Sequence, residues 1–430
     1  MREIIKKIKN KKLVIGVIGL GYVGLPLSIL FAKKKFKIIG FDIDKKKIKS
    51  LCNQKSYIER ISKSDIKILS KSSNFTSNFG HISKCDVIII TVPTPLTKNQ
   101  LPDLHYVKSC LKQIFPFMKK KQTIILESTS YPGTTRELIV NKLKSKFLVG
   151  KELFVGFSSE RIDPGLNENK IHLVPKVVSG YSEKCLKIVS EIYRPIFNSV
   201  VKSESLEVAE FSKLLENVYR SVNIGFINEM KMIADKMRLD IFEIIKVSST
   251  KPFGFRTFHP GPGIGGHCIP IDPMYLYWKS KQLNYNAEFI KLSKETNFKV
   301  LNFLVKKINK LQKKIKVPSK KIKILILGMS YKKNLDDMRE SSSIKLIKKL
   351  LDLNFKYVDY SDPHILKTNI NGINYSKKSI NLTIKNLKKY HITLLMTDHD
   401  KFNYKKIYQY SNTIIDCRGK FKVGDKVIRA

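Results

Sequence analysis

The chain has 430 residues, 42% of them hydrophobic and 10% aromatic, so it is long enough for two or three globular domains. It carries 81 Lys and Arg against 36 Asp and Glu, which gives a formal charge of +45. A charge of this size is compatible with a nucleic acid or an anionic membrane as a partner. The basic residues are scattered along nearly every predicted helix and form no aromatic-studded stripe, which argues against a nucleic-acid partner. We interpret the charge as a drift in composition towards lysine, with some attraction for small anionic substrates.

Six cysteines lie far apart in the sequence, and no two form a C-x-x-C pair. A zinc site or a redox dithiol is therefore not expected, and no metal is assigned. Unpaired cysteines fit a reducing compartment, so we expect the cytoplasm.

The segment Leu13–Ala32 is uncharged and has lysine-rich flanks. Its length of about 20 residues suits a membrane-spanning helix. However, it contains Gly19-Leu20-Gly21-Tyr22-Val23-Gly24, a G-x-G-x-x-G pattern. The pattern follows Leu13–Ile18, which predicts a buried strand, and precedes Leu25–Lys33, which predicts a helix. This order of strand, glycine turn and helix predicts a dinucleotide-binding site, with a membrane helix as the alternative.

The three glycines have separate roles in such a site. Gly19 allows the tight turn, Gly21 lets the backbone approach the pyrophosphate, and Gly24 lets the helix pack against the strand. Phe36–Phe41 predicts the second strand, and Asp42 follows it at the place expected for the acid that binds the adenosine ribose. A carboxylate there repels a 2′-phosphate, so NAD is favoured over NADP, although the lysines that follow weaken this preference.

Three further strands are predicted, and each runs into polar residues at its carboxyl end. They are Cys85–Val92, Thr123–Leu126 and Phe154–Phe157. Alternating strands and helices predict a parallel sheet, and open sheets of this kind bind ligands at the carboxyl edge. Thr129 and Glu160 lie at that edge and are candidate ligand-binding residues. Ordinary loop capping explains them equally well on this pattern alone.

The pattern becomes helical after residue 200. Glu204–Leu239 predicts one long helix, and 275–314 is predicted to be helical again. Lys213 and Asn217 lie on one face of the first helix, at i and i+4. From the pattern alone, Lys213 is more simply one more solvated lysine.

The stretch His259–Pro273, HPGPGIGGHCIPIDP, is the most unusual part of the chain. Its glycines, Gly265 among them, bring the backbone close to another part of the molecule. Cys268 sits beside His267 and just before a helix expected to begin near Asp272, a setting that lowers a thiol pKa and exposes the thiolate. A lone cysteine is more often a small buried hydrophobe, which is how we interpret the other five.

A second α/β unit follows a linker at 317–319. Lys323–Leu327 predicts a strand, Ser341–Leu353 a helix, and Phe355–Asp359 resembles the second strand of the first unit. This unit lacks the full glycine fingerprint, so we do not expect it to bind a dinucleotide in the same way. The predicted fold is α/β, with two Rossmann-like parallel-sheet domains joined by a central helical domain that contains a long connecting helix.

Ten motifs, in order along essentially the whole chain, are shared with one family. They are GLGYVGLPL at 19–27, FDID at 41–44, VPTP at 92–95, ESTSYPGTT at 127–135, SSERIDPG at 158–165, AEFSKLLENVYRSVNIGFINE at 209–229, PGPGIGGHCIPIDP at 260–273, GMSYKKNLDDMRESSS at 328–343, TDHDKF at 397–402 and DCRG at 416–419. With them the chain resembles the nucleotide-sugar 6-dehydrogenases, the family of UDP-glucose and GDP-mannose dehydrogenases.

The resemblance implies that two NAD⁺ oxidise a sugar C6 alcohol to a carboxylate. Cys268 would capture the aldehyde as a thiohemiacetal, and a second oxidation would leave a thioester for water to hydrolyse. Covalent capture prevents release of the reactive aldehyde. Lys213 would stabilise the oxyanion at C6. Asn217 and Asp272 would hold the catalytic water and its polar network, and Glu160 would act as the base in hydrolysis.

The resemblance also implies that Thr129 positions water and contacts the nicotinamide. The implied cofactor-binding residues are Gly19, Gly21, Tyr22, Val23, Gly24, Asp42, Thr94, Thr129 and Arg339. The implied substrate-binding residues are Glu160, Arg161, Lys213, Asn217, Arg256, Gly265, Lys332 and Arg418.

Two departures from the family pattern bear on the substrate. The usual SPER is SSER at 158–161, and Pro164 replaces the acid that UDP-glucose enzymes have four residues after the glutamate. The second departure, with GGHCIPIDP, resembles the UDP-N-acetylglucosamine and UDP-N-acetylgalactosamine 6-dehydrogenase branch. Arg256 is a candidate for an arginine that some members extend across a dimer interface.

These observations lead us to expect oxidation of a UDP-N-acetylhexosamine, of the GlcNAc or GalNAc type, by a cytoplasmic homodimer that makes a precursor of surface polysaccharide. The expected domains are an NAD-binding domain at 1–200, a helical dimerisation and catalytic domain at 201–315, and a nucleotide-sugar-binding domain at 316–430. Three alternatives remain: a UDP-glucose 6-dehydrogenase, a catalytically silent NAD-binding relative, and a two-electron dehydrogenase of the β-hydroxyacid type. The last two leave Cys268 unexplained.

Overall fold

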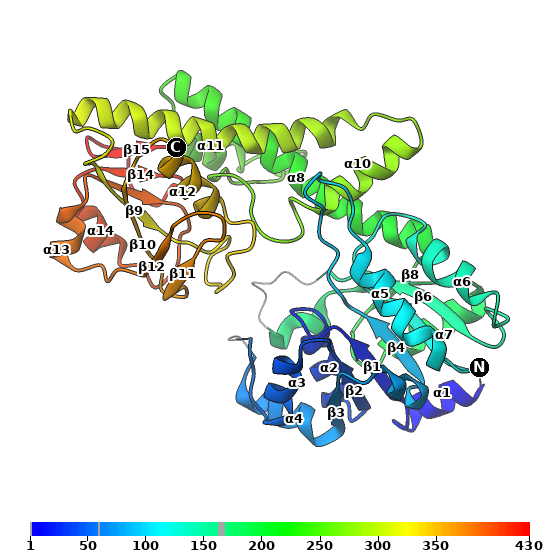
Figure 1. Cartoon of the computed structure of the whole chain (residues 1–430). Coiled ribbons are helices and arrows are strands. Elements are labelled where there is room, and N and C mark those ends of the chain that lie inside the picture. The colour runs from blue at the N-terminus through cyan, green and yellow to red at the C-terminus, as the bar shows by residue number, and fades with distance from the viewer. Residues whose placement is uncertain (1, 59–60, 162–167) are drawn as a thin grey trace. The chain divides into compact units, whose positions relative to one another are not determined.

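The computed structural model describes residues 2–58, 61–161 and 168–430, and the chain divides into two compact units. Unit 1 comprises Met1–Glu216 with Met274–Tyr285, and unit 2 comprises Asn217–Pro273 with Asn286–Ala430. Each unit is built around its own sheet, which is mostly parallel in unit 1 and parallel throughout in unit 2 (Figure 1).

The sheet of unit 1 has eight strands in the order β3-β2-β1-β4-β5-β6-β7-β8. The strands are β1 (Val14–Ile18), β2 (Lys37–Phe41), β3 (Ser73–Thr76), β4 (Val87–Ile90), β5 (Thr123–Leu126), β6 (Phe154–Ser158), β7 (Lys176–Gly180) and β8 (Val200–Lys202). Neighbouring strands are parallel except β6 and β7, which are antiparallel. The predicted α/β class is confirmed, and the reversed pair at one end of the sheet was not anticipated.

Helices cover both faces of this sheet. They are α1 (Arg2–Lys9), α2 (Gly24–Lys33), α3 (Lys45–Cys52), α4 (Lys63–Ser72), α5 (His105–Ile114), α6 (Asn141–Leu143) and α7 (Glu183–Tyr193). Val87 and Ile89 of β4 belong to the apolar core formed with α1, α2, α4 and α7. Ile88 and Ile90, which point to the opposite face, are equally buried. A strand buried on both faces is apolar throughout, which explains the unbroken hydrophobic run of β4.

The segment Leu13–Ala32 is not a membrane helix. It forms β1, a glycine turn and most of α2. Among the described residues, no helix is long and apolar enough to cross a bilayer. The membrane alternative for this segment is therefore wrong, because its apolar side chains pack against the rest of the sheet.

The helical region differs in detail from the prediction. The long helix is confirmed as α8 (Leu206–Lys236) and belongs to unit 2 from Asn217 onwards. The single helix predicted over 275–314 is wrong, because α10 (Asp272–Gln282) and α11 (Glu288–Ile315) are separate helices. Asn284 lies between them with φ +58°, a left-handed conformation that no helix accommodates. Helix α9 (Ile241–Ser248) was not predicted.

The sheet of unit 2 has five parallel strands in the order β10-β9-β13-β14-β15. Its strands are β9 (Lys323–Leu327), β10 (Tyr357–Ser361), β13 (Ile392–Leu395), β14 (Ile414–Asp416) and β15 (Val427–Arg429), with a separate hairpin of β11 (Lys367–Asn369) and β12 (Ser376–Lys378). Helices α11 and α12 (Ser342–Asp352) cover one face, and α13 (Ile384–Lys389) and α14 (Tyr404–Tyr410) cover the other (Figure 1).

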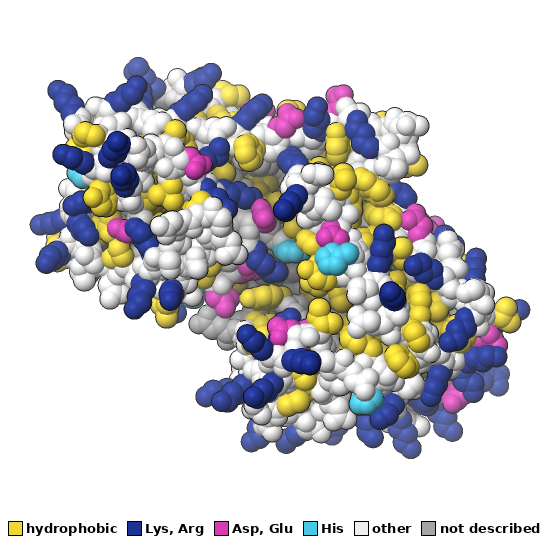
Figure 2. Space-filling model, in the orientation of Figure 1, with side chains coloured by type: hydrophobic (Ala, Val, Ile, Leu, Met, Phe, Trp, Pro, Cys, Tyr) yellow, Lys and Arg dark blue, Asp and Glu magenta, His cyan; other side chains and the backbone are white. Residues whose placement is uncertain are grey.

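Lysine and arginine side chains are spread over the visible face of each unit and do not gather in one patch (Figure 2). This distribution agrees with our interpretation of the +45 charge as a drift in composition. The expected absence of a nucleic-acid partner stays a prediction.

Candidate active site

The three glycines of the turn between β1 and α2 have different surroundings, and each surrounding indicates a different role. Gly19 has φ +92°, a conformation that glycine adopts without strain. A Cβ on Gly24 would lie 2.1 Å from the Gly19 carbonyl oxygen, so Gly24 allows helix and strand to approach. A Cβ on Gly21 would meet nothing within 4 Å. The protein itself therefore leaves the space at Gly21 open, as a pyrophosphate beside the helix N-terminus requires.

Asp42 lies directly after β2 and is buried at this turn. Its carboxylate accepts hydrogen bonds from the backbone N–H groups of Leu20, at 2.9 Å, and Asp44, also at 2.9 Å. The Lys47 ammonium lies 3.2 Å from the same carboxylate. The acid is thus held beside the glycine turn, where the ribose of a dinucleotide is expected. Of the other implied cofactor residues here, Tyr22 packs against the core and Val23 precedes α2.

The polar residues predicted at the carboxyl edge follow adjacent parallel strands. Thr94 follows β4, Thr129 follows β5 and Glu160 follows β6. The Ser128 hydroxyl donates to the Val92 carbonyl at 2.7 Å and ties the ends of β4 and β5 together. The structure therefore brings these residues to one edge of the sheet. Pro164, the residue on which the prediction of an N-acetylated sugar partly depends, lies outside the described residues.

Sequence reasoning missed two charged residues beside Glu160. Lys176 begins β7, and its ammonium lies 2.9 Å from Glu127 and 3.6 Å from Glu160. Glu127 was visible as the acid that ends the strand β5, within ESTSYPGTT. Lys176 had no comparable signal, because only the pairing of β7 with β6 places it there.

Two implied substrate residues lie on or beside α8 in unit 1. Lys213 is only 8% exposed, so the interpretation as a solvated surface lysine is wrong. Among the described residues, no carboxylate forms an ion pair with the Lys213 ammonium. Arg161 pairs with Glu216 of the same helix at 2.8 Å and also donates to the Pro175 carbonyl at 3.1 Å.

The glycines of the loop before α10 approach other parts of unit 2. A Cβ on Gly265 would lie 2.7 Å from the Tyr331 side chain, and Gly266 has φ +87° with the same ring against it. The Gly266 N–H also donates to the Arg339 carbonyl at 3.1 Å. The predicted close approach of this loop is confirmed, and its neighbour is the segment that follows β9.

Cys268 is exposed at the end of this loop. Its carbonyl accepts the N–H groups of Ile271, at 3.1 Å, and Asp272, at 2.8 Å, so the thiol stands on the turn that starts α10. The Asn217 side-chain amide donates to the buried Asp272 carboxylate at 2.5 Å. Asn217, Asp272 and the Cys268 turn, which are far apart in the sequence, therefore meet in unit 2.

The remaining cysteines differ from Cys268. Cys85, Cys110, Cys185 and Cys417 are buried. Burial raises the pKa of Cys85 and of Cys110 to about 12, and that of Cys417 to about 11, which keeps these thiols unreactive. Cys52 is exposed, so interpreting all five as buried is wrong for that residue.

His267 precedes Cys268 in the chain and is partly buried. Burial, followed by the charge of Arg339, lowers the pKa of His267 below its ordinary value of about 6.5. The imidazole is therefore neutral near pH 7. A charge on His267 therefore does not contribute near pH 7, and a lowered pKa of the Cys268 thiol stays a prediction.

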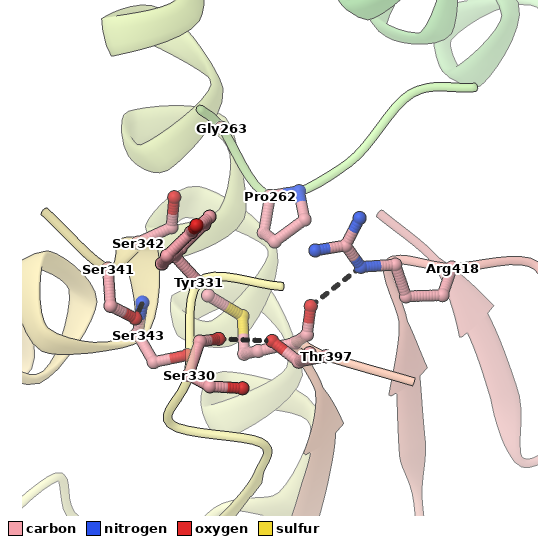
Figure 3. Close-up of a pocket in the computed structure, with 10 residues that line it drawn as sticks. Pro262, Gly263, Ser330, Tyr331, Ser341, Ser342, Ser343, Thr397 and Arg418 are labelled. Carbon is pink, nitrogen blue, oxygen red and sulfur yellow. Dashed lines mark hydrogen bonds between the residues drawn. The ribbon is translucent and has the colours of Figure 1, made fainter. Parts of the chain in front are cut away.

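A small pocket opens at the carboxyl edge of the second sheet (Figure 3). Ser341, Ser342 and Ser343 line it from the N-terminus of α12, and Thr397 and Arg418 line it from the ends of β13 and β14. The Arg418 guanidinium donates to the Met396 carbonyl at 2.7 Å and keeps further N–H groups at the pocket. A helix N-terminus beside a guanidinium suits an anionic group. Sequence reasoning identified Arg418 but missed the three serines.

The other implied residues of unit 2 have varied surroundings. Arg339 pairs with Asp337 of its own loop at 2.7 Å, and Arg256 is exposed. Lys332 is partly buried, and its carbonyl accepts the Ser330 hydroxyl at 2.9 Å. Their roles towards NAD and the sugar stay predictions.

Three models of one family match the chain in order. They describe the UDP-glucose/GDP-mannose dehydrogenase family: its NAD binding domain at residues 13–197, its central domain at 207–299 and its UDP binding domain at 325–423. Together they match most of the chain.

Curated relatives and solved structures agree with these matches. Protein CapL of Staphylococcus aureus is 34% identical over 94% of this chain and 93% of its own. The UDP-N-acetyl-D-glucosamine 6-dehydrogenase of Pseudomonas aeruginosa is 35% identical over 83% of this chain and 84% of its own. The structure of a UDP-D-ManNAc dehydrogenase from Pyrococcus horikoshii is 26% identical with a TM-score of 0.87, covering 97% of this chain and 99% of that one. The chain therefore belongs to the UDP-glucose/GDP-mannose dehydrogenase family and is an NAD-dependent nucleotide-sugar dehydrogenase.

Proposed function

We propose that this chain oxidises C6 of a UDP-N-acetylhexosamine, of the GlcNAc or GalNAc type, to a carboxylate, with two NAD⁺ reduced for each sugar. The curated relatives at 28–35% identity support an N-acetylated sugar. They include UDP-N-acetyl-D-glucosamine and UDP-N-acetyl-D-mannosamine dehydrogenases and an NDP-N-acetyl-D-galactosaminuronic acid dehydrogenase. UDP-glucose is the alternative substrate.

The observation that carries this proposal is the setting of Cys268. It is exposed on the turn into α10, beside the Asn217–Asp272 hydrogen bond, whereas four other cysteines are buried. An accessible thiol is what covalent capture of an aldehyde requires, because the thiolate must reach the carbonyl carbon. A catalytically silent relative would have no use for this arrangement.

The residues divide the chemistry between them. The glycine turn of unit 1 and Asp42 would hold NAD, which would supply the hydride acceptor for both oxidations. Cys268 attacks the aldehyde carbon, and Lys213 stabilises the oxygen that gains negative charge. In the last step Glu160 takes a proton from water as the water oxygen attacks the thioester, and the C–S bond breaks to return the Cys268 thiolate. Thr129 positions water at the sheet edge.

Product stoichiometry tests this scheme directly. The protein is incubated with UDP-GlcNAc, UDP-GalNAc, UDP-ManNAc or UDP-glucose, and NADH and uronic acid are counted. We expect two NADH per acid with an N-acetylated sugar. One NADH with an aldehyde or ketone product would overturn the scheme, and a preference for UDP-glucose would overturn the choice of sugar. Cys268→Ser should still bind NAD and UDP-sugar but lose turnover.

We also propose that the enzyme is a homodimer in the cytoplasm that makes a polysaccharide precursor. Tyr219, Phe226 and Ile233 recur every seven residues on α8, and all three are exposed. Such an apolar stripe on a long helix suits a second copy of the chain. Sedimentation at micromolar concentration tests this: a monomer would contradict it.

A further inference from the structure

Lys176 is a charged residue in the interior of unit 1. It is only 3% exposed at the start of β7, although lysine is almost never fully buried unless it is paired. Its ammonium lies 2.9 Å from one oxygen of Glu127 and 3.6 Å from one oxygen of Glu160. One buried cation therefore connects the carboxylates that follow two adjacent strands, β5 and β6.

Aromatic residues enclose the same cation. The Tyr193 hydroxyl, on α7, donates to the Glu127 carboxylate. The rings of Tyr193 and Phe197 lie 5.3 Å and 5.4 Å from the Lys176 ammonium. Glu127 and Tyr193 thus hold Lys176, and Glu160 is the less deeply buried of the two carboxylates beside it.

Lys176 keeps its charge in this setting. Burial favours the neutral amine, but the charges of Glu127 and Glu160 outweigh burial and raise the pKa of Lys176 above its ordinary value. The residue is an ammonium throughout the neutral range. It can therefore act on Glu160 by charge.

Stability alone does not explain a buried group of this kind. Taking ions out of water costs about as much as their attraction returns, and apolar replacements of similar volume are often as stable. A buried ion pair does restrict the position and orientation of its members. Of the residues in this cluster, Glu160 is the one with a role in the function proposed above.

Resting on that function, we propose that Lys176, held by Glu127 and Tyr193, is a positioning residue that sets the Glu160 carboxylate for hydrolysis of the thioester. Lys176 touches no reacting atom. Water attacks the thioester carbon, Glu160 accepts the water proton, and the sulfur of Cys268 leaves as the thiolate. The two hydride transfers precede this step and do not use Glu160, so they should not depend on Lys176.

Loss of Lys176 should therefore separate oxidation from hydrolysis. Lys176→Met removes the charge and keeps most of the volume. Mixed rapidly with UDP-sugar and NAD⁺, this variant should release a burst of two NADH per active site and then turn over about 100-fold more slowly than the unmutated enzyme, the size of effect expected when base catalysis fails. Intact-protein mass spectrometry should show the sugar acyl group on the chain.

Hydroxylamine provides a second test, because it should restore turnover to a variant that fails in hydrolysis but not to a variant that is only misfolded. Its nitrogen attacks the thioester carbon and forms a C–N bond, and the C–S bond breaks. A sugar hydroxamate is released, and Cys268 is restored without help from Glu160. NADH production by Lys176→Met should therefore recover with hydroxylamine.

Two further variants keep the test decisive. Lys33→Met is the matched control, because Lys33 pairs with Asp65 at 2.6 Å and is not part of this cluster; it should turn over normally. Glu127→Gln keeps the side-chain shape but removes the charge that pairs with the Lys176 ammonium. This variant replaces Lys176→Met in the test if Lys176→Met does not fold. Normal steady-state turnover, or a smaller burst, would overturn the inference. A single NADH per sugar from the unmutated enzyme would instead overturn the proposed function.

Discussion

The two α/β units begin in the same way and end differently. In each, a strand leads to a glycine with φ near +90°, Gly19 after β1 and Gly328 after β9. In each, the second strand ends at an aspartate that accepts the N–H of the residue after that glycine. Asp42 accepts Leu20 at 2.9 Å, and Asp362 accepts Met329 at 2.7 Å.

The two aspartates differ in what else surrounds them. Asp362 also accepts the N–H groups of Ser330, His364 and Ile365, and His399 lies 3.1 Å away. The Asp362 carboxylate therefore accepts more hydrogen bonds from the protein than Asp42 does, since among the described residues Asp42 accepts two backbone N–H groups and pairs with Lys47.

The turns differ as well. The space beside Gly21 is open, but the corresponding region after Gly328 is filled by Ser330, which is buried and bonded to His399 and Thr397. Helix α2 starts six residues after β1 ends, and α12 starts only at Ser342, after a longer loop. In unit 1 the carboxyl edge of the sheet thus leaves space for a dinucleotide beside Gly21. In unit 2 the protein's own residues fill the corresponding space, and the Arg418 pocket lies beside it.

The largest effect should come from Asp362→Ala. Removing a buried carboxylate leaves several backbone N–H groups without their acceptor and takes one partner from His399, which should cost about 3–5 kcal/mol in the free energy of unfolding. Trp278, the single tryptophan, lies in unit 1, so its fluorescence reports that unit, while far-ultraviolet circular dichroism reports both. In urea, only the dichroism transition should move. If only the fluorescence transition moved, the claim that Asp362 stabilises unit 2 would be contradicted.

Acid should remove the same contribution in the unmutated chain. Burial opposes ionisation of Asp362, but hydrogen bonds from His399 and from backbone N–H groups outweigh burial and lower its pKa. A carboxylate with a lowered folded pKa stabilises above its unfolded pKa of about 3.9, and this stabilisation is lost as pH falls through the folded pKa. The difference in urea midpoint between the unmutated chain and Asp362→Asn should therefore shrink below about pH 4. A difference that stays constant with pH would show that ionisation is irrelevant.

Gly21→Val should come next in size. Its side chain fits the protein, so the fold should survive, but the side chain occupies the space of the pyrophosphate. Steric conflict of about 3 kcal/mol corresponds to an NAD dissociation constant about 100-fold higher. Isothermal titration measures the affinity and thermal unfolding checks the fold. Gly24→Val is the contrast, because its side chain would strike the Gly19 carbonyl and should lower the melting temperature. Unchanged NAD binding by Gly21→Val would refute the open-edge interpretation.

Asp42→Ala should have the smallest effect. It removes one ribose hydrogen bond, the repulsion of a 2′-phosphate and the acceptor of the Leu20 and Asp44 N–H groups, so affinity for NAD should fall about 10-fold and discrimination against NADP should weaken. Steady-state KM values for both cofactors measure this. Equal use of NADP by the unmutated enzyme would contradict the role of Asp42.

Much of the chemistry was readable because it lies in short ordered motifs. The glycine turn, Asp42, Cys268 and the start of α10 at Asp272 all follow from local spacing. Asn217 and Asp272 were named through the family resemblance, but their hydrogen bond joins residues 55 positions apart. Lys213 illustrates a limit, since a lysine in a lysine-rich helix gives no sign of burial.

The sequence by itself determined β1, β2, β4, β5, β6 and β9, the long helix and the family, because apolar runs, glycine spacing and apolar periodicity are local properties of the chain. Tertiary structure alone decided that β7 runs against β6 and brings Lys176 to Glu160 and Glu127. It also decided that His399 lies beside Asp362 at the carboxyl edge of the unit 2 sheet. These contacts join residues 16 to 49 positions apart, and burial sets their strength, so no local pattern records them.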